Sequence, residues 1–113
     1  MAKINSKQKG ARGERELSNI LKEHGFDTRR TAQYSGIGAS VNDNADVIGL
    51  PHIHIECKRV ERLNISNAMQ QAIDDSSEQN YPTVFHRKDR EPWLVTMRLE
   101  DWIDLYKKYL ENN

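Results

Sequence analysis

The stretch of sequence that decides the fold reads DVIGLPHIHIECK and runs from Asp46 to Lys58. Residues 46–49 and 52–60 each predict a β-strand, and a tight connection at Leu50 and Pro51 joins them. Apolar and polar residues alternate along the second strand, so its side chains point in turn to opposite faces of a sheet. One face carries Ile53, Ile55 and Cys57, and the other carries His52, His54, Glu56 and Lys58.

This hairpin brings two carboxylates together. With residues 50–52 as the connection, Asp46 falls directly opposite Glu56, and the Cβ atoms of such a pair are about 5 Å apart. Two carboxylates this close repel each other unless a proton or a cation lies between them. Mg²⁺ suits the pair because it binds one or two carboxylates together with water and phosphate oxygens. Lys58, on the same face as Glu56, is placed to orient or deprotonate a water or to neutralise charge on a phosphate.

The same residues also have purely structural explanations. Glu-x-Lys in a strand is common on solvated surfaces, and an aspartate at a strand start also suits a turn. We expect His52 and His54 to be surface side chains rather than metal ligands. Zinc is disfavoured because the chain has neither a Cys-x-x-Cys nor a His-x-x-x-His spacing.

Outside the hairpin, apolar residues recur with helical spacing in three segments. Helices are predicted over residues 10–24, 65–79 and 99–110. Gly25 directly follows the first of these helices and suits the position after a helix end. Trp102 and Tyr106 lie on the apolar face of the last helix. We expect these two rings, and that of Trp93, in the core or in a dimer interface.

The remaining segments complete one domain. Further strands are predicted over residues 27–30, 83–87 and 93–97. Residues 31–45 are rich in Ser, Gly and Asn and predict a long mobile loop, and residues 1–9 predict a flexible basic arm. The order α-β-β-β-α-β-β-α over residues 1–113 predicts a single α/β domain of α+β-like character, in which helices flank a mixed β-sheet.

The composition excludes several classes of protein. The chain has 113 residues, with 17 basic and 17 acidic side chains, which argues against a wholly basic nucleic-acid coat protein. Eight of the basic but only four of the acidic side chains fall in residues 1–30, so a basic surface and an acidic cation site can coexist. The single cysteine, Cys57, cannot form an internal disulfide, and the sequence predicts neither a signal peptide nor a membrane span. We therefore expect a cytoplasmic protein.

Two stretches together resemble a known family. Residues 9–17 read KGARGEREL and are followed by HGF at residues 24–26 and by Arg30. They resemble the N-terminal helix of archaeal-type Holliday-junction resolvases, which belong to the PD-(D/E)xK nuclease superfamily. Asp46, the nine intervening residues and the Glu56-Cys57-Lys58 tripeptide are similar to that superfamily's metal and catalytic core. Ala45 stands where the signature has proline, and the loop over residues 31–45 is longer than in compact archaeal resolvases.

The resemblance implies a restriction-endonuclease-like fold and a role for each matching residue. Glu14, Asp46, Glu56 and the backbone carbonyl of Cys57 would bind Mg²⁺, for which Mn²⁺ could substitute. Lys58 would act on the water or the phosphate, and Gln71 would support the active site, although it equally fits a solvated surface. The residues expected to contact the DNA backbone are Lys9, Arg12, Arg15, Arg29, Arg30 and Arg87. Arg87 also fits a charged turn.

These roles predict an endonuclease that resolves four-way DNA junctions. Paired nicks across a junction need two active sites, so we expect a homodimer. One alternative is a nuclease of the same fold that acts on flaps, ends or linear duplex DNA, and another is a non-catalytic DNA-binding accessory protein. We expect no small-molecule cofactor and no membrane partner, and an action in the cytoplasm of a prokaryotic or virus-infected cell.

Overall fold

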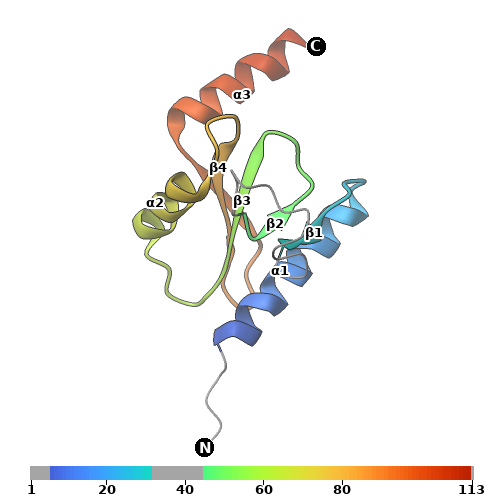
Figure 1. Cartoon of the computed structure of the whole chain (residues 1–113), viewed down its shortest axis with the longest axis vertical. Helices are drawn as coiled ribbons and strands as arrows, with labels where there is room; N and C mark the ends of the chain where they lie inside the picture. Colours follow the sequence, from blue (N-terminus) through green and yellow to red (C-terminus); the bar gives the residue numbers. More distant parts are fainter. Residues whose placement is uncertain (1–5, 32–44, 113) are drawn as a thin grey trace, which may run out of the picture.

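The fold is a mixed five-stranded sheet with helices packed around it (Figure 1). The computed structural model describes residues 6–31 and 45–112, with side chains from residue 10 onward. The described elements are α1 (Ser6–Glu23), β1 (Arg29–Arg30), β2 (Val47–Ile48), β3 (Ile53–Arg59), α2 (Ile65–Asp75), β4 (Tyr81–Arg87), β5 (Leu94–Met97) and α3 (Leu99–Glu111). The predicted order of elements is confirmed, and the architecture is consistent with the restriction-endonuclease-like fold.

The strands lie in the sheet in their order along the chain, β1-β2-β3-β4-β5. All neighbouring strands are antiparallel except β3 and β4, which are parallel and are joined by the crossover helix α2. Val47 pairs with Ile55. This pair confirms the predicted register at Val47. The regular pairing does not extend to Asp46, which precedes β2 and donates its N–H to the carbonyl of Ile55 instead of pairing with Glu56.

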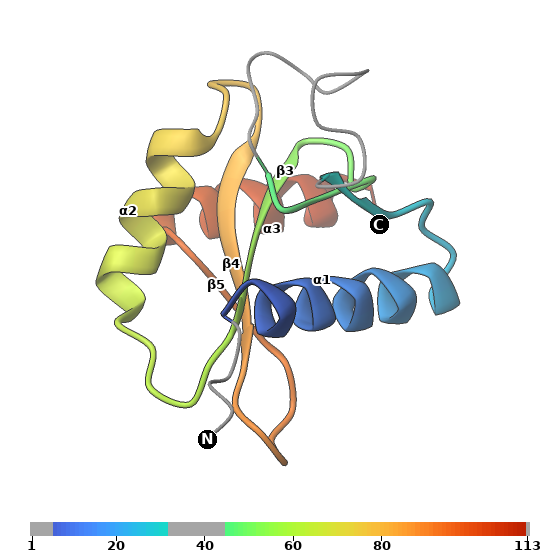
Figure 2. The ribbon, with the colours of Figure 1, turned by 60° about the horizontal axis from the view of Figure 1, so that its bottom comes forward.

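Helices cover both faces of the central strands. Leu17 of α1 packs with Ile55 and Phe85. On the other face, α2 packs on Val84, the residue before Phe85 in β4. Because successive strand residues point to opposite faces, α1 and α2 lie on opposite sides of the sheet, as Figure 2 shows.

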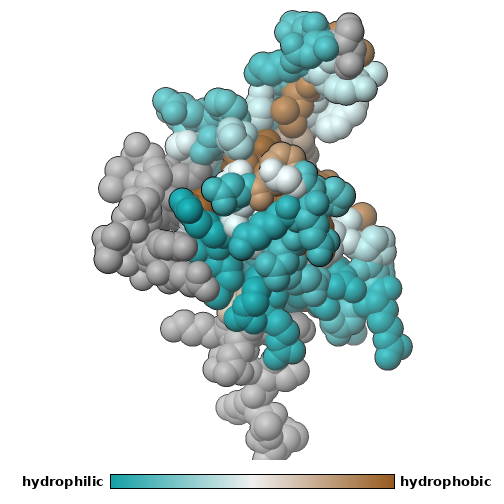
Figure 3. All heavy atoms as spheres, turned by 90° about the vertical axis from the view of Figure 1, so that its right-hand side faces the viewer, coloured by the Kyte–Doolittle hydropathy of each residue, from teal (hydrophilic) through white to brown (hydrophobic). Residues whose placement is uncertain are grey.

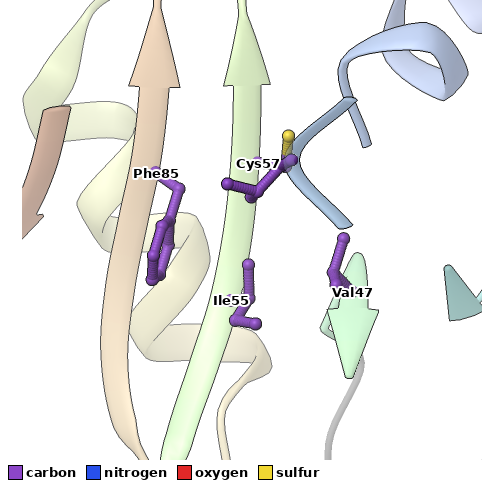
Figure 4. Packing of buried hydrophobic residues seen from close by; sticks show 5 residues of the cluster. Val47, Ile55, Cys57 and Phe85 are labelled. Atoms are coloured by element: carbon purple, nitrogen blue, oxygen red, sulfur yellow. The ribbon is translucent and has the colours of Figure 1, made fainter. Parts of the chain in front are cut away.

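The core under α1 is built from three adjacent strands. Figure 4 shows Val47 of β2, Ile55 and Cys57 of β3, and Phe85 of β4 side by side. Val47 and Ile55 are fully buried, and the Cys57 side chain belongs to the same cluster. This apolar layer fixes β2 against β3 and so sets the position of the hairpin that carries Asp46 and Glu56.

Two helix ends have identifiable local causes. Gly25 follows α1 with a φ of 98° and donates its N–H to the carbonyl of Lys22, as predicted for a glycine after a helix end. Asn64 caps α2 by accepting the N–H of Asn67 at 3.0 Å. The predicted end of this helix at residue 79 is wrong. The helix stops at Asp75 because Ser76 adopts an extended conformation.

Of the two segments expected to be mobile, the N-terminal one is partly helical. Residues 6–9, predicted as part of a flexible arm, belong to α1, whereas residues 1–5 lie outside the described residues. Most of the predicted loop, residues 32–44, is also outside them. The residues that flank this segment are tied together, since the Thr31 hydroxyl donates to the carbonyls of Ala45 at 2.6 Å and Asp46 at 3.1 Å.

The rings of α3 were expected in the core or in a dimer interface, and they do not lie in the core. The side chains of Trp102 and Tyr106 are about half exposed, and α3 has no buried residue. Trp93 does pack against the core cluster under α1. Within the described part of the chain, none of the helices has the length and hydropathy needed to cross a membrane.

Candidate active site

Asp46 directly precedes the first residue of β2 and is held there by two hydrogen bonds to β3. Its carboxylate Oδ2 accepts the backbone N–H of Cys57 at 2.9 Å, and its own N–H donates to the carbonyl of Ile55 at 3.0 Å. The side chain thus replaces a backbone carbonyl as the partner of Cys57, directly before the first residue of β2. Because the N–H and C=O of one strand residue point the same way, the Cys57 carbonyl is directed to the same side as Asp46.

Glu56 is a buried carboxylate on the opposite face of β3 from the Ile55 core. Its side chain is 1% exposed, and its Oε1 lies 3.3 Å from Nε2 of the fully buried His54. Its Oε2 is the one buried side-chain nitrogen or oxygen without a hydrogen-bond partner in the described part of the chain. An unpaired buried carboxylate oxygen is costly, so the position calls for a cation.

The expectation that His54 is a surface side chain is wrong. Its side chain is 0% exposed, because α2 covers the face of β3 that carries His54 and Glu56. Alternation along the strand separates the two faces correctly, but both of them are buried. His54 and Glu56 are therefore core residues, and His54 contacts one oxygen of Glu56 while the other accepts no hydrogen bond.

Lys58 completes the polar face of β3. Its Nζ lies 3.5 Å from Glu56 Oε2 and donates a hydrogen bond to Gln71 Oε1 of α2 at 2.9 Å. The crossover helix therefore supplies a side chain that holds the lysine beside Glu56. The structure brings together the two residues that the sequence predicts for this role, although they are 13 positions apart.

The charge state of the site follows from its burial. Burial, followed by the nearby charge of Glu56, raises the pKa of Asp46 from 3.8 to about 7, against the lowering effect of the Cys57 hydrogen bond. Burial and the same carboxylates raise the pKa of the Cys57 thiol far above its usual range. The thiol thus stays protonated at neutral pH and is no thiolate ligand, whereas Asp46 readily exchanges a proton for a cation.

Glu14 lies near this pair but has a partner of its own. Its charge contributes to the raised pKa of Asp46, and its Oε1 pairs with Arg30 Nε at 3.2 Å. Among residues 10–31 and 45–112, no three His, Cys, Asp or Glu side chains converge into a metal-binding group. The predicted set of Glu14, Asp46 and Glu56 therefore does not converge into one group, and the role of Glu14 in metal binding stays a prediction.

The predicted DNA-contacting residues divide into two groups. Arg12 and Arg15 are exposed on the outer side of α1, and Arg29 is exposed in β1. Arg30 and Arg87 are engaged in ion pairs: Arg30 with Glu14, and Arg87 with Glu16 through its Nη1 at 2.5 Å. The side chain of Lys9 lies outside the described residues.

Glu16 forms a polar cluster that the sequence did not predict. It accepts hydrogen bonds from Arg87 and from the Trp93 indole N–H at 2.9 Å, and Arg59 Nε lies 3.7 Å away. The cluster joins α1 to β3 and to the β4–β5 hairpin. A tryptophan next to a basic hairpin was the available signal, but a partner 77 positions away cannot be read from one sequence.

Two comparisons with known proteins bear on this site. Residues 5–113 match the model of the family described as "Phage putative PDDEXK endonuclease". No curated protein matches the chain. The family match spans nearly the whole chain, including the hairpin with Asp46, Glu56 and Lys58.

Proposed function

Since the chain belongs to this family of phage PDDEXK endonucleases, we propose that it is a Mg²⁺-dependent DNA endonuclease that resolves four-way junctions by paired nicks. The observation that carries the metal-dependent chemistry is the buried Oε2 of Glu56, which accepts no hydrogen bond and lies 3.5 Å from Lys58 Nζ on the strand whose Cys57 N–H donates to Asp46. A DNA substrate and a phage family support an action in the cytoplasm of the infected cell.

The donor set fits a hard divalent cation. Asp46 and Glu56 would hold it, with the Cys57 carbonyl as a third oxygen donor, and two carboxylates plus water suit Mg²⁺ or Mn²⁺. When bound, the cation supplies a lowered pKa for a water molecule and positive charge against the phosphate. Sulfur and imidazole donors are not offered here, since the Cys57 thiol is protonated and His54 is used by Glu56.

The chain's own residues supply the rest of the chemistry. Lys58, held by Gln71, places a positive charge beside Glu56, where it can orient the attacking water or neutralise charge that develops on the phosphate. His54 fixes the orientation of the Glu56 carboxylate. Arg12 and Arg15 on the outer side of α1 are available for phosphates of a duplex arm.

The choice of a four-way junction as substrate rests on the resemblance of residues 9–17 to the resolvase helix. A cleavage assay tests the whole proposal with a labelled four-way junction and a linear duplex of the same arm sequence, each with Mg²⁺, Mn²⁺ or EDTA. We expect metal-dependent, symmetric nicks near the branch point and little cutting of the linear duplex. Equal cutting of both substrates would identify a duplex nuclease. Binding without cleavage would identify an accessory protein.

The matched variants are Glu56→Gln and Glu78→Gln. Glu56→Gln keeps the size of the buried side chain but removes its charge, and we expect at least a hundredfold slower cleavage (about 3 kcal/mol). Glu78 is exposed, and its replacement should leave the rate unchanged. Circular dichroism checks that both variants fold. Cleavage by Glu56→Gln at the wild-type rate would disprove the assignment of this site.

A further inference from the structure

The C-terminal helix carries an apolar face that its own chain does not cover. Six residues recur at intervals of three and four positions along one side of α3: Leu99, Trp102, Ile103, Tyr106, Tyr109 and Leu110. Their exposed fractions lie between 39% and 69%. We call this set the α3 apolar face. A helix side of this kind is normally buried in a core or in an interface.

The contacts of α3 with its own domain are made by another side of the helix. Asp104 and Lys108 hydrogen-bond to the Tyr81 hydroxyl at the start of β4, and the Lys108 contact measures 2.9 Å. At 100° per residue, these two positions point away from the centre of the α3 apolar face. The helix is thus anchored through polar groups while its apolar side faces outward.

The aromatic rings on this face are already ordered. Trp102 and Tyr106 stack with their centroids 5.2 Å apart, and Tyr106 and Tyr109 stack at 6.2 Å. The interplanar angles are 12° and 14°, so the three rings are stacked nearly parallel to one another. Figure 3 shows hydrophobic surface on α3 and directly below it, in contrast to the hydrophilic lower part of this view.

The strand that leads into α3 is also uncovered. β5 is an outer strand of the sheet formed by the described residues, and its Leu94 and Val95 are 55% and 59% exposed. An apolar outer strand offers its backbone groups to a further strand. Leu94 and Val95 are neighbours in one strand and point to opposite faces of the sheet, so they do not both extend the α3 apolar face. The six side chains of that face alone expose on the order of 700 Å², close to the ~800 Å² that each partner buries in a standard interface.

We propose that the α3 apolar face is the dimerisation surface of this protein and that its occupant is the α3 of a second copy, packed antiparallel about a two-fold axis. The charges of α3 fit this arrangement. Glu100 lies at one edge of the face, and Lys107, two turns later, lies at the same edge. An antiparallel pair brings Glu100 of one copy next to Lys107 of the other, twice in each dimer.

Nucleic acid is a poor occupant for the same surface. The helix carries four acidic residues, Glu100, Asp101, Asp104 and Glu111, against two basic ones, Lys107 and Lys108. This balance repels phosphates, so the stacked rings are not a platform for bases. The dimer stands independently of the proposed nuclease activity, although it would supply the two sites that paired nicking needs.

Sedimentation equilibrium of the full chain tests the proposal in the absence of DNA and metal, so its outcome is separate from that of the cleavage assay. We expect a mass of twice 13.1 kDa that falls toward the monomer on dilution. Trp102→Glu and Tyr106→Glu should each weaken the dimer by about thirtyfold or more. Asn19→Glu, which adds the same single negative charge at an exposed position of α1, should leave the dissociation constant unchanged.

A charge exchange tests the antiparallel arrangement itself. Glu100→Lys alone should weaken the dimer a few-fold, and adding Lys107→Glu in the same chain should restore it. Circular dichroism of the diluted variants checks that α3 stays folded. A chain that is monomeric at hundreds of micromolar would overturn the proposal. So would a dimer that survives Trp102→Glu, or a Trp102→Glu variant that loses DNA affinity with no change in mass.

Discussion

The strand β3 and the helix α3 depart from ordinary burial in opposite directions. β3 is covered by a helix on each face, and it buries a histidine and a glutamate completely. α3 lies beyond the end of the sheet (Figure 1) and exposes tryptophan, tyrosine and leucine side chains. Polar groups are thus found where apolar ones would stabilise the fold, and apolar groups where water would favour polar ones.

Both departures cost stability, and each points to a partner that the isolated chain lacks. Glu56 leaves one oxygen without a hydrogen bond inside the domain, 3.5 Å from Lys58 Nζ, and a bound metal ion would offset that cost. α3 leaves an apolar face in water, and a second copy would remove it from solvent. The comparison teaches that the informative residues of a small domain are its buried polar and exposed apolar ones.

The largest effect is expected at Lys58. Lys58→Met keeps the length of the side chain but removes its charge beside Glu56, and we expect the cleavage rate constant to fall about a thousandfold. Gln71→Leu leaves the lysine without its hydrogen bond from α2 and should cost about tenfold, since the charge is kept but less well positioned. Single-turnover cleavage at saturating Mg²⁺ measures both effects.

The neighbouring glutamine provides the control for this prediction. Gln70 lies next to Gln71 on α2 but hydrogen-bonds to Asp74 on the helix surface at 2.9 Å. Gln70→Leu should therefore cleave at the wild-type rate. A Lys58→Met variant that keeps more than a tenth of the activity would show that the lysine is not needed for the chemistry.

Much of the fold could be predicted because its signals are local. The alternation of apolar and polar residues predicted β3, and helical spacing of apolar residues predicted the helices. The short connection at residues 50–52 predicted the pairing of Val47 with Ile55. The burial of both faces of β3 was not predictable in the same way. His54 and Ile55 alternate as in any half-exposed strand, and only the packing of α2 across β3 distinguishes a solvated face from a buried one.

The candidate site was predictable in its residues but not in all its contacts. The spacing of Asp46, Glu56 and Lys58 identified the carboxylate pair and the lysine. The pairing of Glu14 with Arg30 was missed, because an ion pair between a helix and a strand depends on how the two elements dock. The apolar side of α3 was predicted correctly, but one sequence cannot show whether such a side meets its own core or another chain.

A smaller effect is expected on the stability of the metal-free protein. Asp46→Asn keeps the acceptor for the Cys57 N–H but removes a charge that burial disfavours. The folded-state pKa of Asp46, about 7, is above the unfolded value near 3.8, so the wild type loses stability as the pH rises across this window. We expect Asn to stabilise the variant relative to wild type by roughly 3 kcal/mol at pH 8 and by much less at pH 4.

Urea denaturation in EDTA at the two pH values measures this difference. Asp27→Asn, at an exposed position, should show no such pH-dependent gain. Adding Mg²⁺ should stabilise the wild type and leave Asp46→Asn unchanged, since a ligand stabilises only the form that binds it. An Asp46→Asn variant that is less stable than wild type at pH 8 would mean that the buried charge has a compensating partner and that β3 carries no stored cost.

The smallest effect is expected from the distance between a helix and the sheet. α1 and α3 differ in this distance as well. A Cβ added at Gly13 of α1 would lie 2.5 Å from the Cβ of Arg59 on β3, whereas one added at Gly10 meets nothing within 4 Å. Alanine favours a helix over glycine by about 1 kcal/mol at either position, but the overlap at Gly13 costs about 2 kcal/mol. Gly10→Ala should therefore raise the free energy of unfolding and Gly13→Ala should lower it, as thermal or urea denaturation of the two variants would show.

Because Gly13 precedes Glu14, the shift of α1 should also slow cleavage in Gly13→Ala alone. Equal stabilisation by both substitutions would mean that α1 lies as loosely on β3 as α3 does on the end of the sheet.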